Sequence, residues 1–294
     1  MIARAPLPVV LPPYRDELLS SWIIRHAAFY AISPKDVLRH CLGEAMSLRT
    51  VDLRLREDQL TRLGYMFATE VAYIRRMTFV NVAPHLHRFI SPVPVHACTR
   101  CSVAHTEPRP VFRGEFTAWR VTCKACGDFL VHPTASNSRS PVSRYIPLAL
   151  HGEHLIDEEV ERGVRTWASP TAIARLLLMR RLTFCAPGAA GHWRARMLSS
   201  VIPDLDDVCC GCDLALPSPA YPIMPIHLRS AWLAGVATVE QAGPAMLDIL
   251  RSQMLNNNPI DFGETSRKPV FNGVTNLTRQ WQIMRESASS DSRV

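Results

Sequence analysis

Lysine is almost absent from this sequence, and several signals that define common protein classes are missing as well. Only Lys35, Lys124 and Lys268 are lysine among the 33 lysines and arginines of the 294-residue chain. No run of about 18 apolar residues occurs, so no membrane-spanning helix is expected. The chain also lacks a G-x-x-x-x-G-K-[ST] phosphate loop and the G-x-G-x-x-G, H-E-x-x-H and G-x-S-x-G motifs. A binding protein is therefore favoured over an enzyme.

The first residues lack the features of an export signal. Met1–Val10 holds one arginine, two prolines and no continuous apolar segment. We therefore expect a cytoplasmic protein whose thiols stay reduced. Its nine cysteines, an odd number, fit metal binding and free thiols better than a disulfide framework.

The formal net charge of +7 favours an acidic partner such as nucleic acid. Arginine, the dominant basic residue, suits bidentate contacts to phosphates and base edges. The excess charge is spread along the chain, however, and a GC-rich genome would enrich arginine in any protein. The arginine bias is therefore only supporting evidence for a DNA partner.

The strongest chemical signal is a pair of Cys-x-x-Cys motifs, Cys98–Cys101 and Cys123–Cys126, separated by 21 residues. Each motif can form a tight turn that directs two thiolates to one point, and four thiolates in a tetrahedron suit Zn²⁺. Strand formers fill Glu115–Thr122, and Gly127 follows the second pair, where such a turn often needs a positive φ. We interpret residues 95–132 as a zinc ribbon, in which the ligands Cys98, Cys101, Cys123 and Cys126 form a closed, structural site.

Disulfides and a redox pair are the alternatives for these four cysteines. A reducing compartment disfavours disulfides, and two motifs flanking a hairpin disfavour a thioredoxin-like redox site.

A third Cys-x-x-Cys pair, Cys209 and Cys212, predicts a second zinc site if two further ligands complete it. The candidates for those ligands are Cys185, His192 and the His151–His154 segment, and free thiols in a loop are the alternative. His151-Gly152-Glu153 also resembles the start of the zinc deaminase signature, but Val208 stands where that signature has proline.

Helical spacing of apolar residues follows Asp16 as far as Tyr30. Ser33 and Pro34 then read as an N-cap and a first helical residue, and Gly43 as the end of that helix.

Two further short helices are predicted over Glu57–Phe67 and Thr69–Thr78, with Thr69 as the cap of the second. Joined by a tight turn, they fit a helix-turn-helix in which the second helix contacts DNA through Tyr73, Arg75 and Arg76. A packed helix pair with a solvated arginine face is the alternative.

The predicted fold class is mostly α with a small β zinc ribbon. The expected domains are an N-terminal helix-turn-helix-like domain over residues 1–94, the ribbon over 95–140, a helical domain over 141–286 and a disordered tail over 287–294. Prolines mark residues 83–97 as a linker into the ribbon. Helices are expected in the second half over residues 171–184, 192–202, 225–241, 245–254 and 275–285.

The order of these features resembles the TniQ family. Pro12–Trp22 is similar to the family's N-terminal signature, a proline-led segment before a D-E-x-L-x-S-W-like helix. Arg75–Thr78 then ends a helical region, the first cysteine pair follows, and Trp119-Arg120 precedes Cys123. The resemblance covers about residues 11–132. In the family the second knuckle usually reads C-x-x-H-G, where this chain has Cys126, and a further Cys-x-x-Cys often follows soon after.

The resemblance implies an accessory factor of transposition that has no catalytic role. Such a targeting adaptor binds target DNA or a target-marking complex, and recruits an AAA+ ATPase regulator that directs a DDE transposase. The implied partners are therefore DNA, the ATPase and either the transposase or an RNA-guided complex, with a homodimer left open. A zinc-ribbon transcription regulator with a helix-turn-helix is the alternative, and a zinc enzyme acting on nucleic acid is a third reading.

Overall fold

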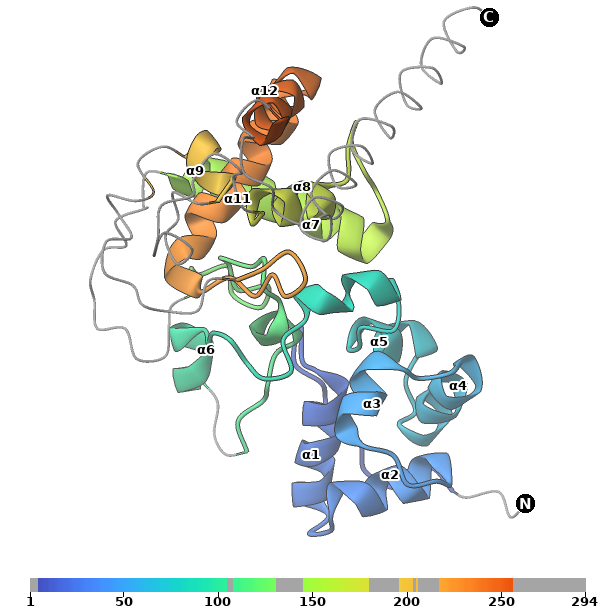
Figure 1. Ribbon diagram of the computed structural model, residues 1–294. Helices are drawn as coiled ribbons and strands as arrows, with labels where there is room; N and C mark the ends of the chain where they lie inside the picture. The colour runs from blue at the N-terminus through green and yellow to red at the C-terminus, as the bar shows by residue number, and fades with distance from the viewer. Residues whose placement is uncertain are drawn as a thin grey trace, which may run out of the picture. The chain divides into compact units, whose positions relative to one another are not determined.

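The computed structural model describes residues 5–104, 108–130, 145–179, 196–202, 205 and 217–255. These ranges are mostly helical, as predicted, and their β-structure is limited to isolated bridges such as Glu17–Phe112 and Thr122–Phe129 (Figure 1). None of the helices in these ranges combines the length and the apolar character that a membrane span requires.

The chain forms two compact units that interleave in sequence. The N-terminal unit comprises residues 1–87, 92–117 and 122–133, and the C-terminal unit comprises residues 88–91, 118–121 and 134–294. Two short segments, residues 88–91 and 118–121, therefore belong to the C-terminal unit although their neighbours in sequence belong to the N-terminal unit.

Short helices make up the N-terminal unit (Figure 1). They are α1 (Leu19–Phe29), α2 (Pro34–Leu42), α3 (Leu48–Leu53), α4 (Glu57–Met66), α5 (Val71–Arg76), α6 (Thr99–Ala104) and the 3-10 helices η1 (Pro84–Phe89) and η2 (Arg113–Phe116). The last two residues of η1 already belong to the C-terminal unit. Leu19, Trp22 and Ile23 of α1 are fully buried at the centre of one apolar cluster. Trp22 stacks on Phe67 with ring centroids 4.5 Å apart, which fixes α1 against the end of α4.

The ends of α2 follow the sequence prediction. The Ser33 side chain accepts a hydrogen bond from the Asp36 N–H, Pro34 is the first helical residue, and Gly43 ends the helix with φ +82°. A left-handed residue at this position is the usual way to close a helix, and glycine adopts it without steric cost.

The helix pair α4 and α5 is present, but the predicted cap is wrong. The turn passes through Ala68, whose φ is +44°, and the Thr69 N–H donates to the carbonyl of Gly64. Because Thr69 closes the turn in this way, Glu70 is the residue that precedes the helix, and it makes no side-chain cap. Helix α5 therefore spans Val71–Arg76 instead of Thr69–Thr78.

The predicted strand over Glu115–Thr122 is also wrong, and residues 83–97 are not a plain linker. Helix η2 occupies the start of the first segment and η1 lies in the second. The backbone before and within η2 bonds to distant segments: the Leu18 N–H donates to Val111 and the Arg113 N–H donates to Asp16. Since these groups pair with the start of α1, no hairpin ladder forms in the described residues between the cysteine pairs, 102–104 and 108–122.

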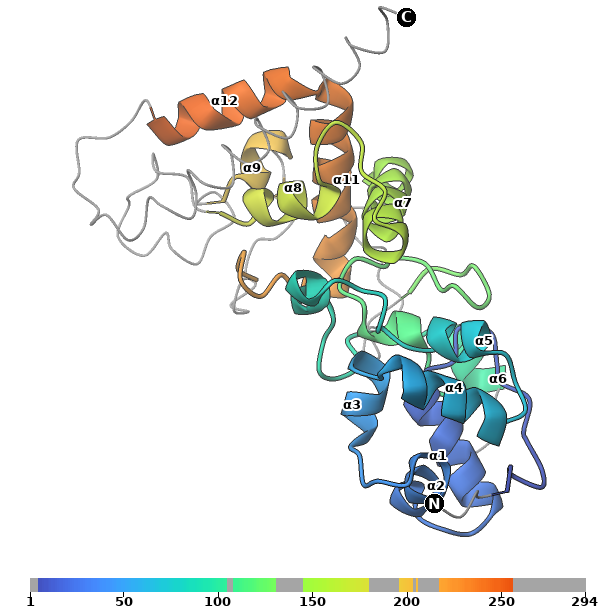
Figure 2. The ribbon, with the colours of Figure 1, turned by 90° about the vertical axis from the view of Figure 1, so that its right-hand side faces the viewer.

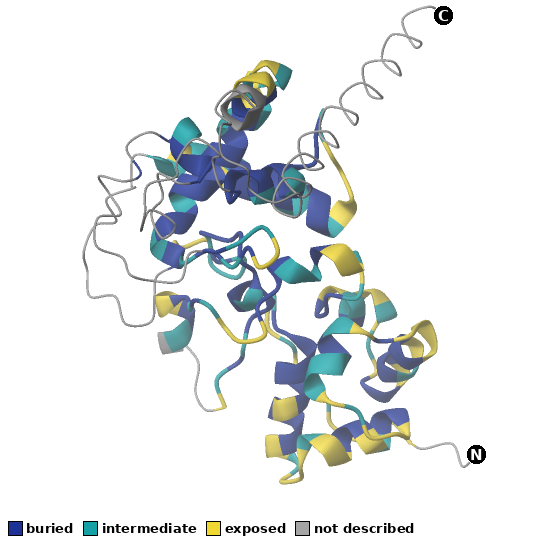
Figure 3. Ribbon diagram, viewed as in Figure 1, coloured by how far each residue is buried: buried dark blue, intermediate teal, exposed yellow. Residues whose placement is uncertain are grey.

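The C-terminal unit is built around one buried helix. It contains α7 (Ile146–Arg162), α8 (Pro170–Leu177), α9 (Leu198–Val201), α11 (Ile226–Ala242) and α12 (Pro244–Leu255). Helix α11 lies against the other four and is buried on all sides over most of its length (Figures 2 and 3). A Cβ added to Gly152 of α7 would lie 2.1 Å from the carbonyl oxygen of Leu233, so the two backbones touch at this point.

The predictions for the second half have mixed outcomes. Residues 225–241 and 245–254 form helices almost as predicted, whereas α7 is an additional helix. The helix predicted over residues 171–184 ends at Leu177, where the Leu178 and Met179 N–H groups turn back to the last helical carbonyls. Of residues 192–202 only Leu198–Val201 is described as helix. The predictions over residues 275–285 and 287–294 lie outside the described residues.

Candidate metal centre and the network around it

The first cysteine pair lies at the start of a helix. Cys98 directly precedes α6, and its carbonyl accepts hydrogen bonds from both the N–H and the hydroxyl of Ser102, at 2.8 and 2.7 Å. This turn fixes the backbone between Cys98 and Cys101, so both thiols lie at the N-terminal end of α6.

The second pair lies in a tight turn. The Gly127 N–H donates to the carbonyl of Cys123, and the Cys123 N–H donates to the carbonyl of Asp128, both at 2.8 Å. Gly127 has φ +82°, as its place after the motif predicted, because the chain must reverse directly behind Cys126. The bridge between Thr122 and Phe129 closes the base of the turn.

The four sulfur atoms converge on one point. All four lie within 4.8 Å of one another, with Cys98 and Cys126 at 3.3 Å and Cys101 and Cys123 at 3.8 Å. A tetrahedral zinc with Zn–S bonds of about 2.3 Å requires sulfur–sulfur distances of about 3.8 Å. The thiols are unbonded to each other, and three of the four cysteines are buried. The cluster therefore has the size and the donor set of a metal site.

The surroundings act differently on the individual thiols. Burial raises the pKa of Cys123 to about 11, and burial also raises the pKa of Cys101. Burial acts in the same direction on Cys126, but the Asp128 backbone and the other three thiols hydrogen-bond to it and lower its pKa overall. Four adjacent thiolates repel one another, so a bound cation is the natural means of keeping them ionised together.

The Asp16-Glu17 signature ties the segment before η2 to α1. Asp16 has a positive φ of 63°, and its carboxylate accepts the Gly114 N–H at 3.0 Å. The fully buried Glu17 carboxylate accepts hydrogen bonds from the Tyr14 N–H and the Ser21 hydroxyl. The Ser21 hydroxyl in turn accepts the Val111 N–H at 2.8 Å. The signature thus fixes the position of the segment that connects the two cysteine pairs.

The same signature holds the proline-led segment against α1. The Trp22 indole N–H donates to the carbonyl of Leu11 at 2.8 Å, and Arg25 donates to the carbonyl of Pro12. His26 accepts the Leu11 N–H on Nε2, so its Nδ1 carries the proton and donates to the Trp22 carbonyl. Burial lowers the pKa of His26, which keeps this ring neutral. The buried positions of the signature therefore have structural roles that motif matching alone did not reveal.

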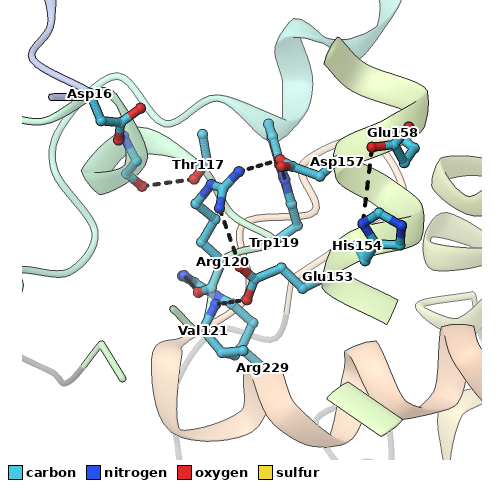
Figure 4. Close-up of polar contacts among 11 residues, drawn as sticks. Asp16, Thr117, Trp119, Arg120, Val121, Glu153, His154, Asp157, Glu158 and Arg229 are labelled. Atoms are coloured by element: carbon cyan, nitrogen blue, oxygen red, sulfur yellow. Dashed lines mark hydrogen bonds and ion pairs between the residues drawn. The ribbon is translucent and has the colours of Figure 1, made fainter. Parts of the chain in front are cut away.

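Trp119 and Arg120 contact residues of the C-terminal unit (Figure 4). The Trp119 indole N–H donates to Asp157 at 3.0 Å, and the Arg120 guanidinium pairs with both Glu153, at 3.2 Å, and Asp157. The second carboxylate oxygen of Glu153 accepts the Val121 N–H at 2.8 Å. Helix α7 thus binds residues 118–121 through two carboxylates one helical turn apart.

A second buried arginine also binds this segment. Arg229 of α11 is fully buried, and it donates to the carbonyl of Arg120 at 2.6 Å and to the carbonyl of Met224. Burial lowers its pKa to about 9, while the charge of Glu153 acts in the opposite direction, so the guanidinium stays charged at neutral pH. Glu153 therefore serves an ion pair, which explains its role without the deaminase-like reading of His151-Gly152-Glu153.

The predicted DNA contacts lie on α5. Arg76 is exposed and lies over the Tyr73 ring at 5.7 Å, and Tyr73 is half-buried. Arg75 pairs with Glu57 of α4. The structure places all three residues on one short helix. Cys209 and Cys212, the predicted second metal pair, lie outside the described residues, as do Cys185 and His192.

The family comparison agrees with the resemblance drawn from the sequence. The family model described as TniQ matches residues 8–128. The chain carries a TniQ domain. The match contains the Asp16-Glu17 signature, the four cysteines and the Trp119-Arg120 pair, and it confirms the assignment to the TniQ family over these residues. No curated protein and no solved structure matches the chain. The TniQ domain associates the protein with transposition.

Proposed function

We propose that the protein is a targeting adaptor of transposition, which binds target DNA and recruits an AAA+ ATPase that directs a DDE transposase. The observation that carries this proposal is the TniQ domain together with its cluster of four cysteines. An adaptor needs no reacting groups, but it does need surfaces held in fixed positions.

Zinc is the proposed occupant of the cluster, with Cys98, Cys101, Cys123 and Cys126 as its ligands. When bound, the metal cross-links the start of α6 to the turn before Gly127. Because four thiolates close the coordination sphere, no position is left for a water or a substrate, and the role is structural. The half-buried ligand Cys126 and the exposed ion pair of Arg100 with Asp128 lie at the surface of this region. This surface is the proposed docking region for the ATPase.

The helix pair α4 and α5 is the proposed DNA-contacting element. Its tight turn through Ala68 and the exposed Arg76 fit a helix-turn-helix, in which the second helix enters the major groove. Arg75 would have to exchange Glu57 for a phosphate or a base, which an exposed ion pair permits at little free-energy cost.

A capture experiment with the full-length chain tests the proposal. The tagged protein is incubated with the AAA+ ATPase encoded beside it, with and without a DNA duplex, and bound ATPase is measured. We expect capture that increases with DNA. The Cys98→Ser variant should lose zinc and most of the ATPase, whereas Cys41→Ala, which changes a buried cysteine outside the cluster, should retain both. A protein that ignores the ATPase and binds a palindromic site as a dimer would instead be a transcription regulator.

A further inference from the structure

A long stretch of the TniQ domain contains no acidic residue. From Val71 to Thr106 the sequence has neither aspartate nor glutamate, although it includes several arginines and histidines. Helix α3, which packs beside part of this stretch, contributes a single acid, Asp52, and that side chain is buried and accepts the Ser20 N–H at 3.0 Å. Burial raises the pKa of Asp52 to about 7, so it neutralises neighbouring cations only in part.

The fold brings the basic residues of α3 and η1 together. The Phe79 N–H donates to the Asp52 carbonyl at 2.7 Å, which joins α3 to the segment that leads into η1. The His87 ring then bonds to the Val82 carbonyl at 3.0 Å and so turns back toward that segment. Arg49, Arg54 and His85 are near enough to His87 for their charges, after burial, to lower its pKa.

We name these four residues, Arg49, Arg54, His85 and His87, the α3–η1 face. Arg54 and His85 are exposed, and Arg49 and His87 are half-buried, so all four residues contribute to the accessible surface.

Several surface arginines elsewhere in the protein form ion pairs. Arg39 pairs with Asp36 at 2.8 Å, Arg56 with Asp58 at 3.1 Å and Arg162 with Glu158 at 3.2 Å. Those cations are neutralised within the protein, as is usual for a solvated face. The two arginines of the α3–η1 face bring positive charge to one surface, which favours the binding of an anion.

We propose that the α3–η1 face binds the sugar–phosphate backbone of target DNA. The proposal rests on the proposed function and adds to it a contact surface separate from α5. Two arginines on one face can bind separate phosphates, because each guanidinium can form a bidentate contact. Backbone contacts carry little sequence information, so this face positions the protein on the duplex, whereas α5 is the element that would read bases.

The test is the salt dependence of binding, measured by fluorescence anisotropy with the full-length protein and a labelled duplex. In the Arg49→Gln/Arg54→Gln variant we expect a loss of affinity of about tenfold or more at low salt. The slope of log K against log salt should fall by about 1.8, since each lost phosphate contact removes about 0.9. The Arg49→Lys/Arg54→Lys variant keeps both charges and should keep most of the slope. Arg39→Gln/Arg162→Gln removes the same net charge from ion-paired sites and should change the slope little.

The possible results separate this proposal from the proposed function. DNA binding with an unchanged slope in the Arg49→Gln/Arg54→Gln variant would remove the α3–η1 face from the interface and leave the adaptor role intact. An equal loss in the Arg39→Gln/Arg162→Gln control would show a net-charge effect and overturn the proposal too. No binding of DNA by the unaltered protein at low salt would overturn both. Circular dichroism of each variant checks that the helices are retained.

Discussion

The N-terminal and C-terminal units are held together by different kinds of interaction. In the N-terminal unit, short helices and irregular segments are fixed by buried polar groups such as Glu17, Ser21 and Arg113, and by the cysteine cluster. In the C-terminal unit, long helices pack directly on α11, with backbone contact at Gly152. A unit with little regular structure must satisfy its backbone groups one by one, whereas a helix satisfies its own.

The buried polar contacts of the C-terminal unit are concentrated around residues 118–121, the short segment whose sequence neighbours belong to the N-terminal unit. Arg120, Glu153 and Asp157 form its buried ion pairs, and Arg229 donates to the Arg120 carbonyl. Trp119 packs edge-on against Phe89, which stacks on Trp232, so both inserted segments reach the apolar core of this unit. The TniQ match therefore extends over residues that depend on the C-terminal helices for their environment. A fragment ending at residue 128 should expose Trp119 and aggregate.

Removal of the metal is expected to have the largest effect, and the effect should be confined to the N-terminal unit. A structural zinc contributes on the order of 10 kcal/mol of apparent binding free energy, which is also folding free energy of its site. In hydrogen-exchange mass spectrometry, a zinc chelator should abolish protection over residues 95–104 and 122–130. Protection of α7 and α11 should be unchanged, since their contacts lie within the C-terminal unit. Loss of protection in α11 would show that both units depend on the metal.

Arg120→Met should have the next largest effect, and it acts on the polar part of the C-terminal unit. It removes the guanidinium that pairs with the buried Glu153, and breaking such a buried pair costs about 3–5 kcal/mol. Arg162→Met breaks an exposed pair with Glu158 and should cost at most about 1 kcal/mol. Thermal unfolding followed by circular dichroism measures both. Adding Glu153→Gln to Arg120→Met should restore part of the loss; a further decrease would show that the buried Arg229 depends on the charge of Glu153.

Gly152→Ala tests the helix packing that distinguishes the C-terminal unit. The new Cβ would lie 2.1 Å from the Leu233 carbonyl oxygen, so α7 and α11 must separate, at a cost of about 2–3 kcal/mol. Gly235→Ala is the matched control, because its Cβ would meet the ends of leucine side chains, which can move. In Gly235→Ala the better helix propensity of alanine, about 1 kcal/mol, offsets much of the cost of moving these side chains. Equal melting temperatures for the two variants would contradict the backbone contact.

Local signals in the sequence predicted those parts of the fold that depend on neighbouring residues. Ser33, Pro34 and Gly43 define α2 because caps act within one helical turn. The convergence of the four cysteines was predictable for the same reason, since each Cys-x-x-Cys motif forms its own turn. The apolar pattern of α11 was recognised as helical because apolar residues recur along its whole length.

Tertiary pairing decided what the sequence did not predict. Thr69 has the chemistry of a cap, yet its backbone closes a turn onto Gly64. Residues 115–122 have strand propensity, but the segment that precedes them is bound to α1 by Ser21 and Asp16, about ninety residues earlier in the chain. The polar sequence of α7 hides a helix because Glu153 and Asp157 face arginine and tryptophan partners instead of solvent. The DNA contacts of Tyr73, Arg75 and Arg76 stay predictions.

The smallest predicted effect concerns a buried acid of the N-terminal unit. Burial raises the pKa of Asp52 to about 7, although Ser20 hydrogen-bonds to its carboxylate. Because an unfolded aspartate has a pKa of about 3.9, the folded state holds this proton more firmly than the unfolded chain does. The stability that this proton contributes is full below about pH 4 and is lost as the pH rises through 7. The melting temperature should therefore fall between pH 5 and pH 8.

Asp52→Asn should remove part of this fall, because the amide oxygen can still accept the Ser20 N–H and carries no proton to lose. At pH 8 we expect a gain of about 1 kcal/mol, or ~2–4 °C in melting temperature for a chain of this size. Some pH dependence should persist, since burial also raises the pKa of Glu115 to about 7. Asp36→Asn, at an exposed ion pair, is the control. Parallel curves for the unaltered protein and Asp52→Asn would mean that the N-terminal unit tolerates this charge as readily as the C-terminal unit tolerates its paired carboxylates.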